Sequence, residues 1–281
     1  IECAPSCQTC DQISFEMRCP RDDETPMALT KKGDLNYLFE RISTLHTYKP
    51  KIYSRPSISS NHKADHQDND GISSNTIDGP WLVALENFLT PSECDRLIKL
   101  GASEGFKRSV DVGEKKFDGA YGSFENNGRT SQNAWCEKDC SRDPVVQRIH
   151  TKIENVTGIP QINYEFLQLL KYEEGQYYRR HHDYIAFQKD RNPGVRILTV
   201  FLYLNDVEEG GGTHFSSLQN LVVKPQRGMA LVWPSVLDED PNQKDVRTYH
   251  SALPVQKGIK YGANAWIHQR DFKTSYENRC L

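Results

Sequence analysis

No apolar run in these 281 residues approaches the roughly 20 residues that a membrane-spanning helix needs, so no span is predicted. An excess of charge is also lacking. The 35 Lys and Arg residues against 38 Asp and Glu residues leave a net charge of −3, which gives no general reason to bind nucleic acid or membranes. No internal repeat is visible. An initiating methionine is missing too, and we expect Ile1 to follow a removed signal peptide or membrane anchor.

The composition divides the chain into three zones. Residues 1–53 form a cysteine-rich N-terminal extension, in which residues 33–42 are expected to form one short amphipathic helix. Residues 54–79 are rich in Ser, Asn, His and Asp, so we expect a polar linker or exposed loop with His62 and His66 solvated. Residues 80–281 contain the longer apolar segments and are expected to form one globular domain.

The cysteines indicate the compartment. The eight cysteines fall into three sets. The N-terminal group is Cys3, Cys7, Cys10 and Cys19, the close pair is Cys136 and Cys140, and the two separate residues are Cys94 and Cys280. An even, clustered set favours disulfides in an oxidising compartment, although the pairing does not follow from sequence. A zinc site in the N-terminal group is the alternative, but the usual paired Cys-x-x-Cys spacing is only half present. Cys94 is equally compatible with a buried thiol, and the sequon that begins at Asn155 agrees with a secretory route.

Short segments rich in β-branched and aromatic residues predict strands at 81–85, 195–204, 221–225, 229–233 and 261–268. Glycines at 210–212 and at 228 predict tight turns, because glycine adopts positive φ angles at little cost. The fold class that follows is mainly β with flanking helices (α+β), of the sandwich or jelly-roll type. Such a fold can hold a metal between inward-facing side chains.

Two helices are predicted beside these strands. Thr90 is a good N-cap, Pro91 occupies the first helical position and Glu93 completes a capping box. A second helix is predicted for residues 144–155, where apolar residues recur at helical spacing. Both helices are expected to support one face of a sheet.

The pair His181 and Asp183 is the strongest sign of chemistry in the chain. Alternate residues of a strand point to the same side, so these two side chains would project together, while His182 would face away to pack or to form hydrogen bonds. With His250 from a distant strand they would form a 2-His-1-carboxylate face, which suits non-haem Fe(II) and leaves positions open for oxygen. His214 and His268 are the competing ligands.

Many residues, in order, resemble the catalytic domain of prolyl 4-hydroxylases, most of all the plant and algal type. The resemblance runs from about residue 81 to residue 272 and includes Tyr172, Gly175, Gln176, Tyr178, His181, Asp183, Tyr184, Tyr203, Leu204, Val207, Glu208, Glu209, Gly210, Gly211, Lys224, Pro225, Gly228, His250, Pro254, Val255, Gly258 and Lys260. It implies a double-stranded β-helix (jelly-roll) core within residues 80–281. It also implies the cofactors Fe(II), 2-oxoglutarate, O2 and ascorbate.

The resemblance also assigns roles to residues. His181, Asp183 and His250 would hold the metal, and Lys260 would complete the catalytic set by pairing with the distal carboxylate of 2-oxoglutarate, because a buried charge requires a partner. The other residues expected to contact the co-substrate are Tyr172, Thr213 and Trp266. The residues expected to contact the peptide are Tyr178 and Arg196.

The activity that the resemblance implies is hydroxylation of peptidyl proline at C4 in proline-rich secretory proteins. Oxidative decarboxylation of 2-oxoglutarate to succinate and CO2 would accompany it, in the lumen of the endoplasmic reticulum or Golgi. Two alternatives are an oxygenase of the same chemistry acting on lysyl residues or free amino acids, and a non-catalytic peptide-binding module.

Two departures from the family pattern bear on the substrate. Tyr261 stands where the family usually has Trp, and we expect it to preserve an aromatic wall of the site. The loop at residues 236–248 is rich in Asp and polar residues, which puts the peptide preference in doubt.

Overall fold

A computed structural model describes residues 19–20, 24–57, 76–115 and 121–281 of the chain. Three of the N-terminal cysteines, most of the polar segment at 54–79, His62 and His66 lie outside the described residues. The predictions made for those residues therefore stay predictions.

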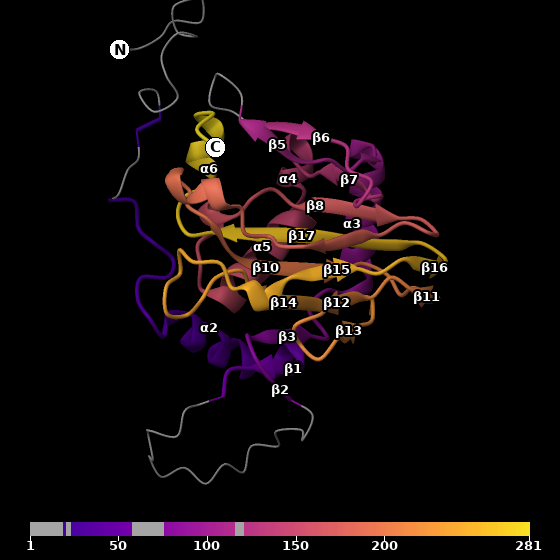
Figure 1. The fold of residues 1–281 in the computed structure, drawn as a ribbon. Coiled ribbons are helices and arrows are strands. Elements are labelled where there is room, and N and C mark those ends of the chain that lie inside the picture. Colours follow the sequence, from indigo (N-terminus) through magenta and orange to yellow (C-terminus); the bar gives the residue numbers. More distant parts are fainter. Residues whose placement is uncertain (1–18, 21–23, 58–75, 116–120) are drawn as a thin grey trace, which may run out of the picture.

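The described residues build two main β-sheets (Figure 1). The first has nine strands, in the order β2 (Ile77–Asp78), β1 (Pro50–Arg55), β3 (Leu82–Leu85), β14 (Ala230–Pro234), β10 (Arg196–Tyr203), β17 (Lys260–His268), β8 (Gln168–Tyr172), β7 (Gln132–Trp135) and β4 (Lys107–Arg108). The second has four strands, in the order β13 (Leu221–Val223), β12 (Thr213–Phe215), β15 (His250–Ala252) and β9 (Tyr178–His181). Two two-stranded sheets pair β5 (Asp111–Lys115) with β6 (Tyr121–Phe124), and β11 (Glu209–Gly210) with β16 (Val255–Lys257).

Helices cover the outer face of the nine-stranded sheet. The α-helices are α2 (Asp34–Ser43), α3 (Pro91–Glu104), α4 (Lys138–Arg142), α5 (Pro144–Thr157) and α6 (Lys273–Glu277), and short 3-10 helices are η2 (His46–Tyr48), η3 (Gln161–Asn163), η4 (Ala186–Asp190) and η5 (Val246–Thr248). The capping box predicted for α3 is confirmed, since Thr90 accepts from the Glu93 amide and the Glu93 carboxylate accepts from the Thr90 amide. No helix in the described ranges is long and apolar enough to span a membrane.

Strand alternation produces two separate cores. On β3, Val83 and Leu85 face the helices, whereas Leu82 and Ala84 face the second sheet. The same alternation runs through β10 and β17, so one set of apolar side chains packs against α2, α3 and α5 and the other fills the space between the sheets. Mainly β layers with helices on one side confirm the predicted fold class, and every second residue of the central strands points toward the four-stranded sheet.

The predicted boundary at residue 54 does not separate two structural units. Strand β1 crosses it and pairs antiparallel with β3, so residues 50–55 extend the same sheet. Helix α2, the predicted N-terminal helix, buries Leu38, Phe39 and Ile42 in the core against α5 and β3. The Asp238 carboxylate, in the Asp-rich loop, accepts hydrogen bonds from the amides of Gly33 and Asn36 at the start of α2. These long-range contacts make the N-terminal segment part of the domain.

Four of the cysteines form two disulfides. Cys19 pairs with Cys280, which joins residues 261 positions apart, and Cys136 pairs with Cys140. The pairing of Cys19 removes one thiolate from the alternative N-terminal zinc site. Cys94 is a buried free thiol, and burial raises its pKa, which disfavours the reactive thiolate.

Peptide mapping without reduction should therefore recover a Cys19–Cys280 cross-link and a Cys136–Cys140 loop. Cys94 should react with iodoacetamide only after denaturation. Rapid alkylation of Cys94 in the folded protein, or recovery of alkylated Cys280 without reduction, would contradict this arrangement.

Candidate metal and co-substrate site

Two strands of the smaller sheet bring the predicted ligands together. The antiparallel register of β9 and β15 places His250 opposite His181. Asp183 lies in a bend just after β9, so the expectation that one strand carries both His181 and Asp183 is wrong in that detail. An Asp183 carboxylate oxygen nevertheless lies 4.0 Å from His181 Nε2, and the other lies 3.7 Å from His250 Nε2. The ligand atoms of these three residues all lie within 4.8 Å of one another.

Hydrogen bonds orient all three side chains toward a common point. The Nδ1 atoms of His181 and His250 lie 2.9 and 3.0 Å from the carbonyl oxygens of Arg179 and Thr248. A carbonyl only accepts, so each Nδ1 carries a proton and each Nε2 is the ring nitrogen left to bind a metal. The Thr199 hydroxyl donates to Asp183 at 2.7 Å and leaves its other oxygen toward His181. Outer contacts of this kind fix ligand geometry before a metal arrives.

The protonation states also suit a metal. Burial lowers the pKa of His181 well below its usual value, and His250 adds to that shift, so the imidazole is neutral at pH 7. Burial alone would raise the pKa of Asp183, but His250, His181 and the Thr199 hydrogen bond outweigh it and bring the value to about 2. Two imidazoles and one carboxylate on one side of a metal leave other positions open and fit Fe(II).

The other histidines have different partners. The His182 ring accepts from the Tyr184 amide at 2.9 Å and lies 2.9 Å from the Asp245 carbonyl, which connects the two ligand-bearing segments without supplying a ligand. His214 lies on β12 against Ser251. His268 lies between the Gly194 carbonyl and the Glu165 carboxylate. Neither of the competing ligands belongs to the group of three.

A small cavity of about 30 Å³ is lined by His181, His250 and Lys260 together. Lys260 is 1% exposed, donates to the Gly211 carbonyl at 2.6 Å, and has the rings of Tyr172, Phe201 and Tyr203 within 5.5 Å. Burial lowers the pKa of Lys260 to about 7. A carboxylate placed here would restore the charged form, which fits one end of 2-oxoglutarate.

Predicted and unpredicted residues line this cavity together. Tyr172 and Thr213 lie in it, as do Tyr178, His181 and His250. The sequence interpretation missed Arg129, whose guanidinium lies over the Tyr178 ring, and Tyr203, whose hydroxyl bonds to Thr213 at 2.6 Å. Alternation along β10 could have placed Tyr203, since it shares a face with Thr199. The volume holds one or two water molecules, so lining side chains must move to admit 2-oxoglutarate.

Two aromatic residues near Lys260 have other positions than expected. Trp266 does not line the Lys260 cavity formed by the described residues; it lies next to Thr199 across the β10–β17 pair and packs against Trp135. Tyr261 faces the helices and contacts Phe106, because adjacent residues of β17 point to opposite faces. The expectation that Tyr261 forms a wall of the site is therefore wrong.

Arg196 is held by an ion pair. Its guanidinium makes two hydrogen bonds to the Glu165 carboxylate, one of them 2.9 Å long, and lies 3.7 Å above the Trp266 ring. His268 binds the same carboxylate at 2.7 Å. Burial raises the pKa of Glu165, but Arg196 and His268 reverse that effect and bring it to about 2. Two of the five N–H donors of Arg196 are thus engaged by Glu165. The role in gripping peptide carbonyls that the sequence had suggested stays a prediction, and it would fall to the remaining donors.

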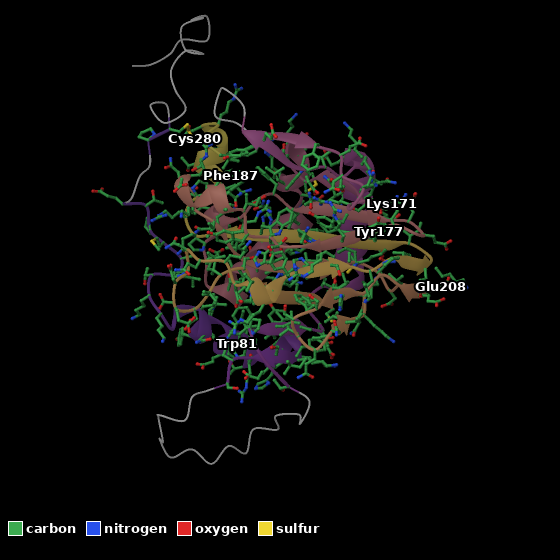
Figure 2. The ribbon with its side chains drawn as sticks, in the orientation of Figure 1. Trp81, Lys171, Tyr177, Phe187, Glu208 and Cys280 are labelled. Atoms are coloured by element: carbon green, nitrogen blue, oxygen red, sulfur yellow. A yellow bond between two sulfur atoms is a disulfide. The ribbon has the colours of Figure 1, made fainter. Side chains whose placement is uncertain are left out.

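A larger groove of about 390 Å³ includes Arg196 in its lining but none of the three ligands. Its lining is mostly apolar, with the aromatic side chains Tyr121, Trp135, Phe166, Phe187, Phe272 and Tyr276. Figure 2 shows Phe187 at the end of the sheets near Cys280. Strand β10 connects the groove with the metal ligands. It carries Arg196, which lines the groove, and three residues later Thr199, which holds Asp183.

Comparison with known proteins agrees with this geometry. Residues 167–268 match the model of the 2OG-Fe(II) oxygenase superfamily. The chain is 33% identical over 213 residues to prolyl 4-hydroxylase 5 of Arabidopsis thaliana, covering 69% of this chain and 70% of that protein. It is 32% identical over 222 residues to probable prolyl 4-hydroxylase 7 of the same plant, covering 71% and 66%.

Among solved structures, the viral collagen prolyl hydroxylase of Paramecium Bursaria Chlorella virus-1, determined as a 2OG complex, aligns with a TM-score of 0.51 and 27% identity. That alignment covers 68% of this chain and 97% of the viral protein. Fold and site together define a 2-oxoglutarate- and Fe(II)-dependent oxygenase with a double-stranded β-helix core. Within that class, the chain belongs to the prolyl 4-hydroxylase family.

Replacing any one of the ligands should abolish metal-dependent turnover. We expect His181→Ala, Asp183→Ala and His250→Ala each to lose binding of Co(II), used as a probe for the Fe(II) site, together with succinate release. The matched control is His182→Ala, which removes no ligand and should keep most of the turnover at saturating Fe(II). A His250→Ala variant with near-normal Co(II) affinity would refute the ligand assignment.

Lys260→Ala should raise the 2-oxoglutarate KM strongly while peptide KM changes little, because only the co-substrate loses its partner. The wild-type KM should also depend on pH. The lysine has to be protonated to pair with a carboxylate, and its pKa without a partner is about 7, so the 2-oxoglutarate KM should rise as pH increases above about 7. An unchanged KM in the variant would place the anchor at another residue.

Proposed function

We propose that this chain hydroxylates peptidyl proline at C4 in proline-rich proteins, with 2-oxoglutarate as co-substrate. The observation that carries the proposal is the His181, Asp183 and His250 triad, of which both histidines line the Lys260 cavity. Asp183 is held by Thr199, three residues along β10 from Arg196 in the groove lining. A metal held there would face the co-substrate on one side and a peptide on the other.

Bound Fe(II) and 2-oxoglutarate would supply the oxidising chemistry: one oxygen atom of O2 enters succinate as CO2 is lost, and the other enters the C4–H bond of proline. The chain's own residues orient and isolate the reactants. Lys260 and the hydroxyls of Tyr172 and Thr213 would bind the distal carboxylate of 2-oxoglutarate. The aromatic rings around Lys260 keep water away from that ion pair, which strengthens it.

The substrate would approach along the groove as an extended chain. Tyr178 stacks on His181 at 3.6 Å between ring centroids, and its hydroxyl donates to Asp111, so its ring forms a fixed wall beside the metal ligands. The ion pair with Glu165 makes Arg196 part of a rigid, internally neutralised groove wall. Polyproline II suits such a groove, because it has no internal hydrogen bonds and loses little entropy on docking.

The cellular setting follows from the cysteines. Two disulfides in the structure favour an oxidising compartment, and we propose the lumen of the endoplasmic reticulum or Golgi. Ascorbate is proposed as the reductant that keeps the iron in the ferrous state between turnovers.

Mass spectrometry of peptides after incubation with Fe(II), ascorbate, O2 and 2-oxoglutarate tests the function. We expect a gain of one oxygen atom on proline, with about one succinate released for each hydroxylation. Free proline and lysine-containing peptides without proline should give neither product above background. Modification of lysine would favour the alternative oxygenase, and peptide binding without succinate release would favour the non-catalytic module.

A further inference from the structure

The end of the chain supplies one wall of the groove. Phe272, Tyr276 and Leu281 all line it, and all three lie beyond residue 268, where the match to the oxygenase family model ends. The Phe272 and Tyr276 rings stack with centroids 6.0 Å apart, and Tyr276 meets the edge of Phe166 at 5.0 Å. This wall therefore lies outside the part of the chain that the family model matches.

The opposite wall is apolar as well. Tyr121 and Phe187 stack with ring centroids 3.5 Å apart, and both line the groove with Trp135 and Val112. Trp135 is 37% exposed and Val112 is 49% exposed, although both are large apolar side chains. Among the charged residues of the lining, Glu165 is paired with Arg196 and bound by His268, and Glu137 and Arg191 carry opposite charges. A groove with these properties favours an uncharged, apolar ligand.

The groove is continuous with the site of the reaction. Arg196 lines it, and Thr199, which holds Asp183, follows three residues later on the same strand. At about 3.3 Å per strand residue, these positions are about 10 Å apart. A polyproline II peptide rises about 3.1 Å per residue, so a side chain about three residues from the reacting proline would reach the groove.

A disulfide holds the C-terminal wall in place. Helix α6 has five residues, too few to be stable alone, and Cys280 connects its end to Cys19. Leu281 follows Cys280 directly, and Figure 2 shows Cys280 beside α6 at the C-terminal end of the chain. In the part of the chain that the structure describes, the Phe272 amide donates to the Ile162 carbonyl and the Phe272 ring packs on His268. The disulfide adds a covalent link at the other end of the segment.

We infer that residues 272–281 form a binding subsite for an apolar or aromatic side chain of the peptide substrate, about three residues from the target proline. The Cys19–Cys280 disulfide holds this subsite in its binding form. The inference rests on the proposed function, and it adds a sequence preference that the metal and co-substrate site does not itself create.

Two sets of proline-rich peptides test the subsite. In each set the residue three positions before or after the reactive proline is Phe, Ser or Asp, and the rest of the peptide is constant. For one of the two positions, the wild-type peptide KM should be about tenfold lower with Phe than with Asp, with Ser between them and 2-oxoglutarate KM unchanged. Equal KM values for all peptides at both positions would overturn the subsite.

Variants then locate the preference. Tyr276→Ala should remove it while leaving turnover of a peptide too short to reach the groove unchanged, and Leu281→Asp, at a 36% exposed residue, should penalise the Asp peptide further. The matched control is Tyr37→Ala, a 70% exposed tyrosine on α2 outside the groove, which should retain the preference. A preference of unchanged size in both groove variants would overturn the assignment to the C-terminal wall. If Tyr276→Ala folds poorly, Leu281→Asp tests the assignment by itself, because the wild-type ratio of the Asp and Phe KM values should then increase.

The role of the Cys19–Cys280 disulfide is tested by the double variant Cys19→Ser and Cys280→Ser, which leaves no unpaired thiol from this pair. It should hydroxylate the short peptide normally and lose the preference for Phe. An undiminished preference would show that the disulfide does not hold the subsite. Absence of hydroxyproline from every peptide, including the short one, would instead contradict the proposed function, so the two failures are distinguishable.

Discussion

The register between β9 and β15 is the contact on which the site depends. It places His250 opposite His181, although the two residues are 69 positions apart in the sequence. A slip of one residue would turn every side chain of the shifted strand to the other face, and one imidazole would then point away from the metal position. Both strands are short, so the pairing needs support from outside the ladder. His182 supplies part of it, since its ring connects the Tyr184 amide with the Asp245 carbonyl.

The nine-stranded sheet likewise fixes the positions of the Asp183 carboxylate, through Thr199, and of Lys260. Thr199 and Lys260 lie on the neighbouring strands β10 and β17, on the face that looks toward the smaller sheet. The opposite faces of these strands bury Val200, Leu202, Ala263 and Ala265 against the helices. The outer core therefore fixes the positions of polar groups on the inner face, and the chemistry is carried by strands that are among the most deeply buried in the molecule.

Local sequence patterns predicted the elements well, because their causes are local. The segment 195–204 became β10, the capping box at Thr90 began α3, and the positive φ angles of Gly210, Gly211 and Gly228 were implied by the turns they form. The same patterns could not show that β1 joins the sheet, or that Glu165 neutralises Arg196, since each depends on partners far along the chain. The resemblance predicted Lys260 and His250 as site residues. No sequence motif predicted that Arg129 lines the cavity or that the C-terminal aromatic residues line the groove.

The charges of the site have a consequence for how it is filled. Asp183 and a protonated Lys260 sum to zero within the chain, and imidazoles bind a metal in their neutral form. A divalent cation adds two positive charges and 2-oxoglutarate adds two negative ones, so only the pair together leaves the buried site as neutral as before. Either one alone leaves a net charge of two units in a region of low dielectric, which is costly. The arrangement therefore couples the affinity for the metal to the affinity for the co-substrate. The coupling is reciprocal, because each ligand lowers the electrostatic free energy of binding the other.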